Sequence, residues 1–167
     1  MRMMTKFFFG IAVVAFTTFC GYIFAKKYRQ RKLFFIQLQT FNERFLSEIA
    51  YYKRPIHEFI AKFPYLGEFS SFLQDFVKAL ANGSFHERTI DELPLYDFLT
   101  QEEKRFVSDY FLMLGKGDSA SQKTYFSAIK ERLISLKDEA VSAHKRYGDL
   151  YVKLGFLCGL FLLILML

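Results

Sequence analysis

The chain has 167 residues, of which 52% are hydrophobic and 22 are phenylalanine, and its formal net charge at pH 7 is +6. This length is typical of one folded domain. The first 32 residues hold seven Lys and Arg and no acidic residue, whereas residues 33–150 hold 15 basic and 17 acidic residues. The central part therefore lacks the basic face of a nucleic-acid-binding module, and we expect no nucleic-acid partner.

The first apolar run, Phe7–Ala25, contains 19 residues without a charge and is long enough to cross a bilayer as a helix. A cleaved signal peptide is the alternative. The run has no small-x-small cleavage site and is followed at once by five basic residues, which favours an uncleaved anchor. We therefore assign residues 1–32 to an N-terminal transmembrane helix with a basic flank.

The central part, residues 33–150, shows helical periodicity and no alternating strand pattern. Apolar stripes predict helices over 33–52, 55–63 and 69–80, the last ending at Asn82-Gly83. Ser84 with Glu87 predicts a further short helix, and Thr100 with Glu103 forms a capping box that opens a helix ending near Gly115. With the final helix, these segments predict an all-α bundle of about six helices.

The final helix is expected to run from Ser119 to Leu167, over about 70 Å. Asp118 or Ser119 is its predicted N-cap, with Gln122 placed as in a capping box. Its charges stop after Lys153, so one continuous helix would begin in water and end in lipid. Apolar residues alternate at spacings of three and four along it, as in a helix-packing seam: Phe126, Ile129, Leu133, Leu136, Ala140, Ala143, Tyr147, Leu150 and Leu154.

The second apolar run, Leu154–Leu167, is shorter, with 14 residues, or 17 if it begins at Tyr151. Such a run also fits a core helix, but because no polar tail follows we assign residues 151–167 to a barely spanning transmembrane helix. Gly155 and Gly159 form a small-xxx-small pair that would let another helix approach closely, although glycine is also simply common in membrane helices.

Basic residues are denser on the inner flank of each run than near Met1, so the positive-inside rule predicts a cytoplasmic central domain with both termini outside. The histidines at 57, 86 and 144 lack the spacing of metal ligands, and the Gly115–Ser119 turn lacks the spacing of a phosphate loop. Cys20 and Cys158 lie in apolar runs and are expected to be small buried residues. We expect no enzyme activity, cofactor or metal.

Several stretches together resemble the stage III sporulation protein AB family of endospore-forming bacteria. They are Phe45–Tyr51 followed by Pro55–Glu58, then Leu114–Asp118 with Gln122, then Tyr147 and the tail Leu154–Leu160. The resemblance implies a component of a secretion-like channel in the mother-cell membrane around the forespore. It also implies a six-helix bundle similar to the cytoplasmic domain of the F-type platform proteins of type II secretion and type IV pilus systems.

Platform proteins of that type are thought to dock a hexameric motor ATPase, so the resemblance implies a motor ATPase and other membrane channel components as partners. They carry two such domains, and this chain carries one, which implies a homo-oligomer in contact with membrane lipid. The matching polar positions Glu48, Tyr51, Asp118 and Gln122 are the predicted interaction residues, although capping and helix-surface pairing also explain them. The alternatives are a lipid-directed membrane enzyme and a helical adaptor or sensor without ATPase docking.

Overall fold

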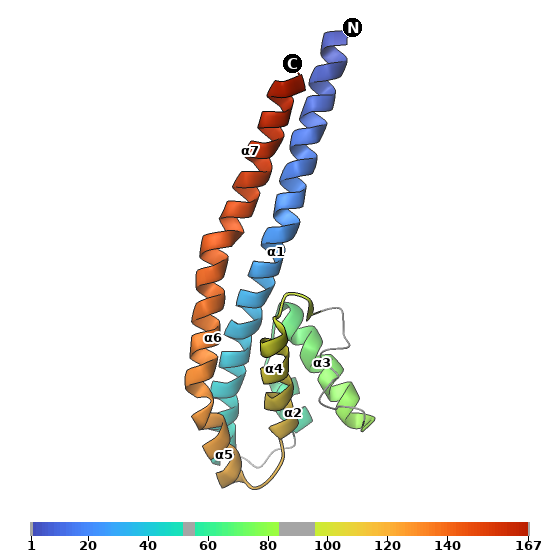
Figure 1. The fold of residues 1–167 in the computed structure, drawn as a ribbon. Coiled ribbons are helices and arrows are strands. Elements are labelled where there is room, and N and C mark those ends of the chain that lie inside the picture. Colours follow the sequence, from blue (N-terminus) through green and yellow to red (C-terminus); the bar gives the residue numbers. More distant parts are fainter. Residues whose placement is uncertain (1, 52–55, 84–95, 167) are drawn as a thin grey trace. The chain divides into compact units, whose positions relative to one another are not determined.

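The computed structural model describes residues 2–51, 56–83 and 96–166 (Figure 1). These residues form helices and turns and contain no strand, which confirms the all-α prediction. The described helices are α1 (Arg2–Tyr51), α2 (Ile56–Lys62), α3 (Gly67–Ala81), α4 (Gln101–Met113), α5 (Ser119–Ala128), α6 (Lys130–Ala143), the π-turn η2 (His144–Gly148) and α7 (Asp149–Met166). The count of about six helices in the bundle stays a prediction, since residues 84–95 lie outside the described part.

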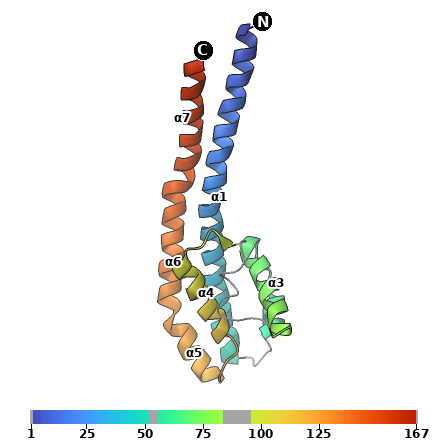
Figure 2. The same ribbon diagram turned by 45° about the vertical axis from the view of Figure 1, so that its right-hand side comes forward.

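The chain divides into two compact units. The terminal unit comprises residues 1–29 and 139–167, and the central unit comprises residues 30–138. Residues 139–150, which the sequence assigned to the central domain, thus belong with the two chain ends. In the terminal unit, the first half of α1 and α7 run side by side in both views (Figures 1 and 2).

The N-terminal anchor and the first domain helix are one element, the 50-residue helix α1. No proline lies within it, and its last glycine is Gly21. The basic flank between the two predicted segments consists largely of Lys, Arg and Gln, which are good helix formers. The chain therefore has no break at residue 32, and α1 contributes to both units.

The predicted ends of α3 and α4 are confirmed. Asn82 caps α3, and Gly83 follows with φ of 64°, the left-handed conformation that glycine adopts without strain. Thr100 and Glu103 form a reciprocal capping box at the start of α4. The predicted cap at Ser84 and Glu87, and Pro55 before α2, lie outside the described residues.

An aromatic core fills the central unit. Phe111 of α4 lies with its ring centroid 4.6 Å from that of Phe72 and 4.9 Å from that of Phe76, and Phe45 of α1 lies 4.9 Å from Phe126 of α5. Most of these rings meet edge to face, the arrangement that the ring quadrupoles favour. Burying this set is what holds α1, α3, α4 and α5 together.

The stretch from Ser119 to Leu165 is one long helical segment, as predicted, but its helical geometry is irregular at two places. A turn at Ile129 separates α5 from α6, and the π-turn separates α6 from α7. At the first irregularity, the carbonyl oxygen of Phe126 accepts a hydrogen bond from Asn42 Nδ2 at 3.3 Å. A side-chain donor at this carbonyl competes with the amide of Lys130, and such insertions bend helices.

The π-turn also changes which residues of α7 face α1. The predicted seam holds up to Ala140, but Leu150 and Leu154 are 44% and 45% exposed, whereas Gly148 and Gly159 are buried. A π-turn inserts one extra residue into a helix, and one residue corresponds to a rotation of about 100°. The seam therefore moves by one position, and the prediction that Leu150 and Leu154 belong to it is wrong.

Candidate functional site

The two apolar helices of the terminal unit meet through small residues, which we call the hairpin contact. A Cβ atom built on Gly155 would lie 2.5 Å from the carbonyl oxygen of Thr17, and one built on Gly159 would lie 2.7 Å from Cα of Val14 and collide with Thr17 Oγ1. On the opposite helix, a Cβ at Gly21 would collide with the carbonyl oxygen of Tyr151. The predicted glycine pair thus lies directly against the backbone of α1.

Aromatic rings lie at the end of the hairpin contact. The ring of Tyr28 is 5.5 Å from that of Tyr147 and 5.8 Å from that of Tyr151, and Tyr151 is also 5.9 Å from Phe24. Exposed basic residues lie beside these rings on both helices: Lys26, Lys27, Arg29, Lys145, Arg146 and Lys153. The arrangement combines an apolar hairpin with an aromatic and cationic margin, as is usual where helices leave a membrane.

Both long helices have the length and composition of membrane spans. One apolar stretch lies in the helix from Phe9 to Ile49 and the other in the helix from Ser119 to Leu165. Only about a tenth of the residues in each apolar stretch are buried inside the protein. A core helix would have most of these side chains buried, so the low burial favours membrane association.

Glu48, a predicted interaction residue, lies at the end of α1 and faces α2. Both of its carboxylate oxygens accept hydrogen bonds from Lys62 Nζ at 3.0 Å. The pair joins two helices, and the pairing of Glu48 with Tyr51 that sequence spacing suggested stays a prediction. The side chain of Tyr51, the second predicted residue, lies outside the described part of the structure.

Asp118 and Gln122, the other predicted interaction residues, shape the turn between α4 and α5. Asp118 is the N-cap of α5, because its Oδ1 accepts the amide of Ser121 at 2.7 Å. Hydrogen bonds from Ser121 hold the pKa of this exposed carboxyl group below its usual range. Because Asp118 and not Ser119 is the N-cap, Gln122 does not occupy the capping-box position, and its Nε2 donates to the carbonyl oxygen of Lys116 at 3.0 Å.

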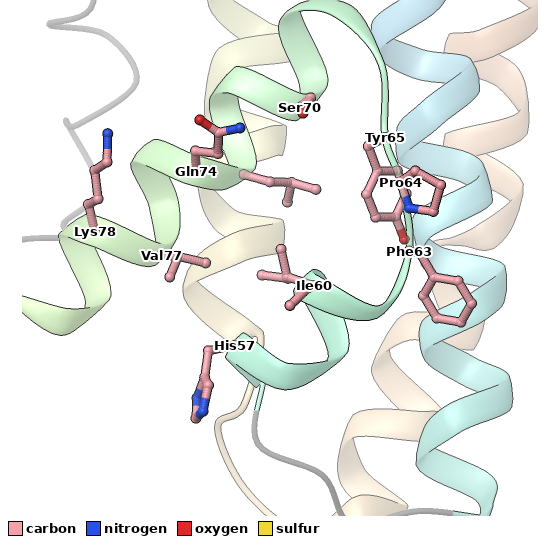
Figure 3. A pocket seen from close by; sticks show the side chains of 11 residues that line it. His57, Ile60, Phe63, Pro64, Tyr65, Ser70, Gln74, Val77 and Lys78 are labelled. Carbon is pink, nitrogen blue, oxygen red and sulfur yellow. The ribbon is translucent and has the colours of Figure 1, made fainter.

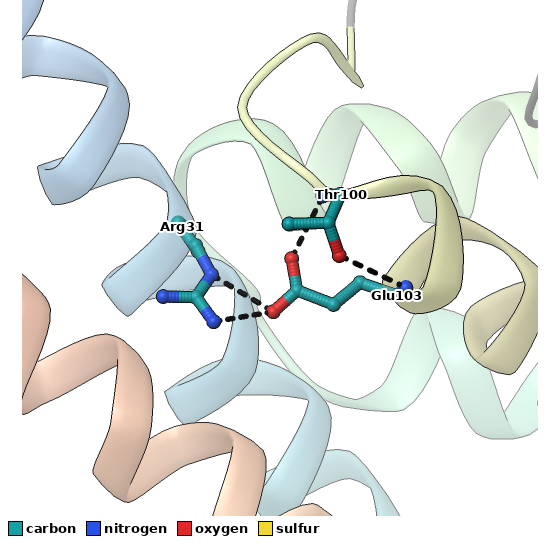
Figure 4. A network of polar contacts seen from close by, with 3 residues as sticks. All are labelled: Arg31, Thr100 and Glu103. Carbon is teal, nitrogen blue, oxygen red and sulfur yellow. Dashed lines mark hydrogen bonds and ion pairs between the residues drawn. The ribbon is translucent and has the colours of Figure 1, made fainter.

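One ion pair in the central unit was not anticipated from the sequence (Figure 4). Arg31 of α1 donates through Nε and Nη2 to one carboxylate oxygen of Glu103, at 2.8 and 2.6 Å. The other oxygen of Glu103 accepts the amide of Thr100 at 2.9 Å as part of the capping box. Glu103 is only 4% exposed, so this carboxylate both caps α4 and fixes it to α1.

A buried polar network also connects three helices of the central unit. Asn42 of α1 donates to the carbonyl oxygen of Phe126 and accepts a hydrogen bond from the Tyr110 hydroxyl at 3.1 Å. Burial raises the pKa of Tyr110 well above its usual range, so this hydroxyl stays a donor. Asn42 is a polar residue within an otherwise apolar stripe of α1. This interruption is the sequence signal that could have identified Asn42 as part of a buried polar network.

A cavity of about 470 Å³ opens between α2 and α3 (Figure 3). Its walls include Ile60, Tyr65 and Val77, and His57 and Lys78 lie at its margin. Burial raises the pKa of Tyr65, and the nearby guanidinium of Arg44 partly offsets this effect. The cavity mixes apolar walls with a few polar groups, which is the general character of a small binding site.

Within residues 2–51, 56–83 and 96–166, no three His, Cys, Asp or Glu side chains gather closely enough to hold a metal ion. Cys20 is half-buried and Cys158 is exposed, so the expectation that both are buried is wrong for Cys158. His57 and His144 lie in different units, and His86 lies outside the described residues.

Together these features define a class of protein: a helical unit inserted between two apolar helices that pack on each other as a hairpin. A family model described as stage III sporulation protein AB matches residues 6–167. The chain therefore belongs to the stage III sporulation protein AB family, as the sequence resemblance predicted. No curated protein and no solved structure matches the chain.

Proposed function

We propose that this chain is a membrane platform component of a sporulation-specific, secretion-like channel between mother cell and forespore. In this role the terminal unit spans the membrane, and the central unit docks a motor ATPase in the cytoplasm. The observation that carries the proposal is the hairpin contact between two apolar helices, since Gly155 and Gly159 lie against the backbone of α1. Membership of the sporulation family supports the cellular setting.

The hairpin suits a platform for a mechanical reason. Both ends of the central unit, at residues 30 and 138, continue into the terminal unit. A unit tethered through two packed helices has less freedom to rotate at the membrane than a unit held by one flexible anchor. A motor that binds such a unit can pass a change of shape to neighbouring membrane proteins. With one such unit in each chain, the platform would consist of several copies together with other channel components.

The predicted docking residues need variants that separate binding from folding. Glu48 is paired with Lys62, and Asp118 caps α5, so a simple charge reversal at either position would also disturb the fold. Exchanging the two charges, with Glu48→Lys and Lys62→Glu, keeps an ion pair between α1 and α2 while changing the surface. Asp118→Ser keeps an N-cap residue and removes the carboxylate.

The test is co-purification from detergent-solubilised sporulating cells. We expect a motor ATPase to accompany the unmodified chain and to be lost from the charge-exchanged or Asp118→Ser variant, while each variant keeps its helical content and membrane location. Lys130→Gln, an exposed change on α6, serves as the control and should retain the ATPase. If no ATPase accompanies the intact, membrane-bound chain, the docking role is wrong.

A second candidate function, a helical adaptor or sensor without ATPase docking, is favoured by one observation. The π-turn lies in the helix that leads from the central unit to the terminal unit, and π-turns are often found at functional positions where a helix changes register. Cysteine crosslinks along residues 126–154 that change with sporulation stage, in cells that show no ATPase association, would support this function over the platform.

A further inference from the structure

The helix segments at the end of the hairpin contact carry six exposed cations, none of which forms an ion pair with a described acidic group. Lys26, Lys27 and Arg29 of α1 are exposed, as are Lys145 and Arg146 of the π-turn and Lys153 of α7. Among the described residues, no ion pair involves any of these six side chains. We call this set the cationic collar.

Tyrosine contacts bring together the two helix segments that carry the collar residues. Tyr28, which is flanked by Lys27 and Arg29, contacts the rings of Tyr147 and Tyr151. These two tyrosines are in turn adjacent to Arg146 and Lys153 in sequence, and the Arg146 guanidinium lies 5.4 Å from the centre of the Tyr147 ring. The only acidic residues in the unit are Glu139 and Asp149. Six exposed cations thus lie on the two helix segments that carry the three tyrosines, and the whole unit holds only two acidic residues.

From this juxtaposition we infer that the collar binds the phosphate groups of anionic phospholipids in preference to zwitterionic lipid. The inference rests on the proposed membrane role of the hairpin. Lipid is the occupant that fits, because the exposed apolar residues next to the collar, such as Phe24 and Leu154, require acyl chains in the same place. Lys and Arg side chains extend toward headgroups while their stems cover apolar surface. Exposed cations without ion partners are free to contact the lipid phosphates.

The strength of the effect follows from electrostatics near a charged membrane surface. Each basic residue close to such a surface strengthens association by about fivefold. Because the side chains are exposed, salt screens the attraction within about 8 Å at physiological ionic strength. The lipid preference should therefore be several-fold, should depend on salt and should disappear when part of the collar is neutralised.

Spin-labelled lipids in vesicles of phosphatidylcholine test the inference with the full chain. We expect labelled phosphatidylglycerol to be immobilised by the protein several-fold more than labelled phosphatidylcholine, and this preference to fall as salt is added. The variant Lys26→Gln, Lys27→Gln, Arg29→Gln should lose the preference. The matched control Lys123→Gln, Lys130→Gln, Arg132→Gln removes three exposed charges from the central unit and should retain it. Added inorganic phosphate should not compete.

Two results would overturn the inference: equal immobilisation of both lipids by the unmodified chain, or equal loss of the preference in the two triple variants. Competition by inorganic phosphate would show a free-anion site rather than a lipid site and would also overturn it. Alkaline extraction of the same vesicles shows whether a negative result concerns the lipid preference of the collar or the proposed membrane-spanning role of the hairpin. A chain that is extracted does not span the bilayer, whereas a retained chain without lipid preference refutes only the collar.

Discussion

The Asn42 side chain makes two buried hydrogen bonds across helices, one to Tyr110 and one to the backbone of α5. An unpaired polar group left in such a place costs about 1–3 kcal/mol. Asn42→Leu should therefore lower stability by about that amount, because both partners lose their hydrogen bonds. Thermal unfolding of the detergent-solubilised chain, followed by circular dichroism, measures the change.

The same network permits a double-mutant test. Tyr110→Phe removes the buried hydroxyl that Asn42→Leu would leave unpaired, so the double variant should be more stable than the sum of the two single losses predicts. Exactly additive losses would show that the Asn42 and Tyr110 side chains do not interact in the folded protein.

Glu103 has two separable functions, and the substitutions at this position should rank accordingly. Glu103→Gln keeps the capping geometry, since glutamine also serves at this position, but replaces the charged partner of Arg31. Glu103→Ala removes both interactions and should cost about 2–4 kcal/mol, more than Glu103→Gln. Equal losses of unfolding free energy in the two variants would mean that the ion pair and the cap do not contribute independently.

Asp118 makes a pH-dependent contribution to folding stability, and the sign of this contribution follows from its lowered pKa. The charged Asp118 carboxylate stabilises the folded state at pH values above the carboxyl pKa of the unfolded chain, which is about 3.9. This contribution to stability is lost as the pH falls through the lower pKa that the carboxyl group has in the folded state. Asp118→Ser retains a cap without a titrating group, so its melting temperature should fall less steeply than that of the unmodified chain over the same acid range. Parallel melting curves for the two proteins would contradict this assignment.

Among the helices, the hairpin contact and the π-turn determine how α1 and α7 pack. Glycine normally weakens a helix relative to alanine by about 0.5–1 kcal/mol. Gly155→Ala should nevertheless destabilise the terminal unit, because the new Cβ would meet the backbone of Thr17. Gly10→Ala is the matched control. Its Cβ would meet only the flexible side chain of Leu163, so its melting temperature should stay near that of the unmodified chain.

If the π-turn is a one-residue insertion, a one-residue deletion should be tolerated there. Removing Lys145 should give a regular helix with Gly155 and Gly159 still facing α1, whereas removing Val152 rotates both glycines away by about 100°. A disulfide between Gly10→Cys and Leu163→Cys reports the packing, because the corresponding Cβ atoms would be 3.8 Å apart. With Cys20 and Cys158 replaced by alanine, we expect the disulfide to survive the first deletion and to be lost in the second.

This part of the helix also shows where prediction from sequence stops. The spacing of Phe126, Leu133 and Leu136 correctly identified the face that is buried. The same spacing continues through Leu150 and Leu154, so periodicity alone extended the seam along leucines that are exposed. The place of an inserted residue depends on backbone contacts between helices, such as those of Gly21 and Gly159. No local sequence pattern reveals such contacts. Caps, by contrast, depend on neighbouring residues, and those at Asn82 and Thr100 were predicted correctly.

For the candidate site, the sequence identified polar positions but not their partners. Gln122 and Glu48 were selected by family motifs, yet Lys116 and Lys62, which they contact, lie at distances along the chain that helix spacing cannot predict. Arg31 was counted only as part of a basic flank, whereas it pairs with a residue 72 positions away. Long-range ion pairs of this kind become visible only once the fold brings α1 and α4 together.

For the whole molecule, we propose that a membrane hairpin holds residues 30–138 in the cytoplasm. Cysteine labelling tests it most directly, in a chain with Cys20 and Cys158 replaced by alanine and a single new cysteine at Thr5, at Ser71 or at Glu102. The three chains are produced in non-sporulating cells, whose cell membrane faces the medium, and are treated with a membrane-impermeant maleimide in intact cells and after lysis. We predict that the Thr5 position is labelled in intact cells and that the other two are labelled only after lysis. Labelling of Ser71 and Glu102 positions in intact cells would contradict the account.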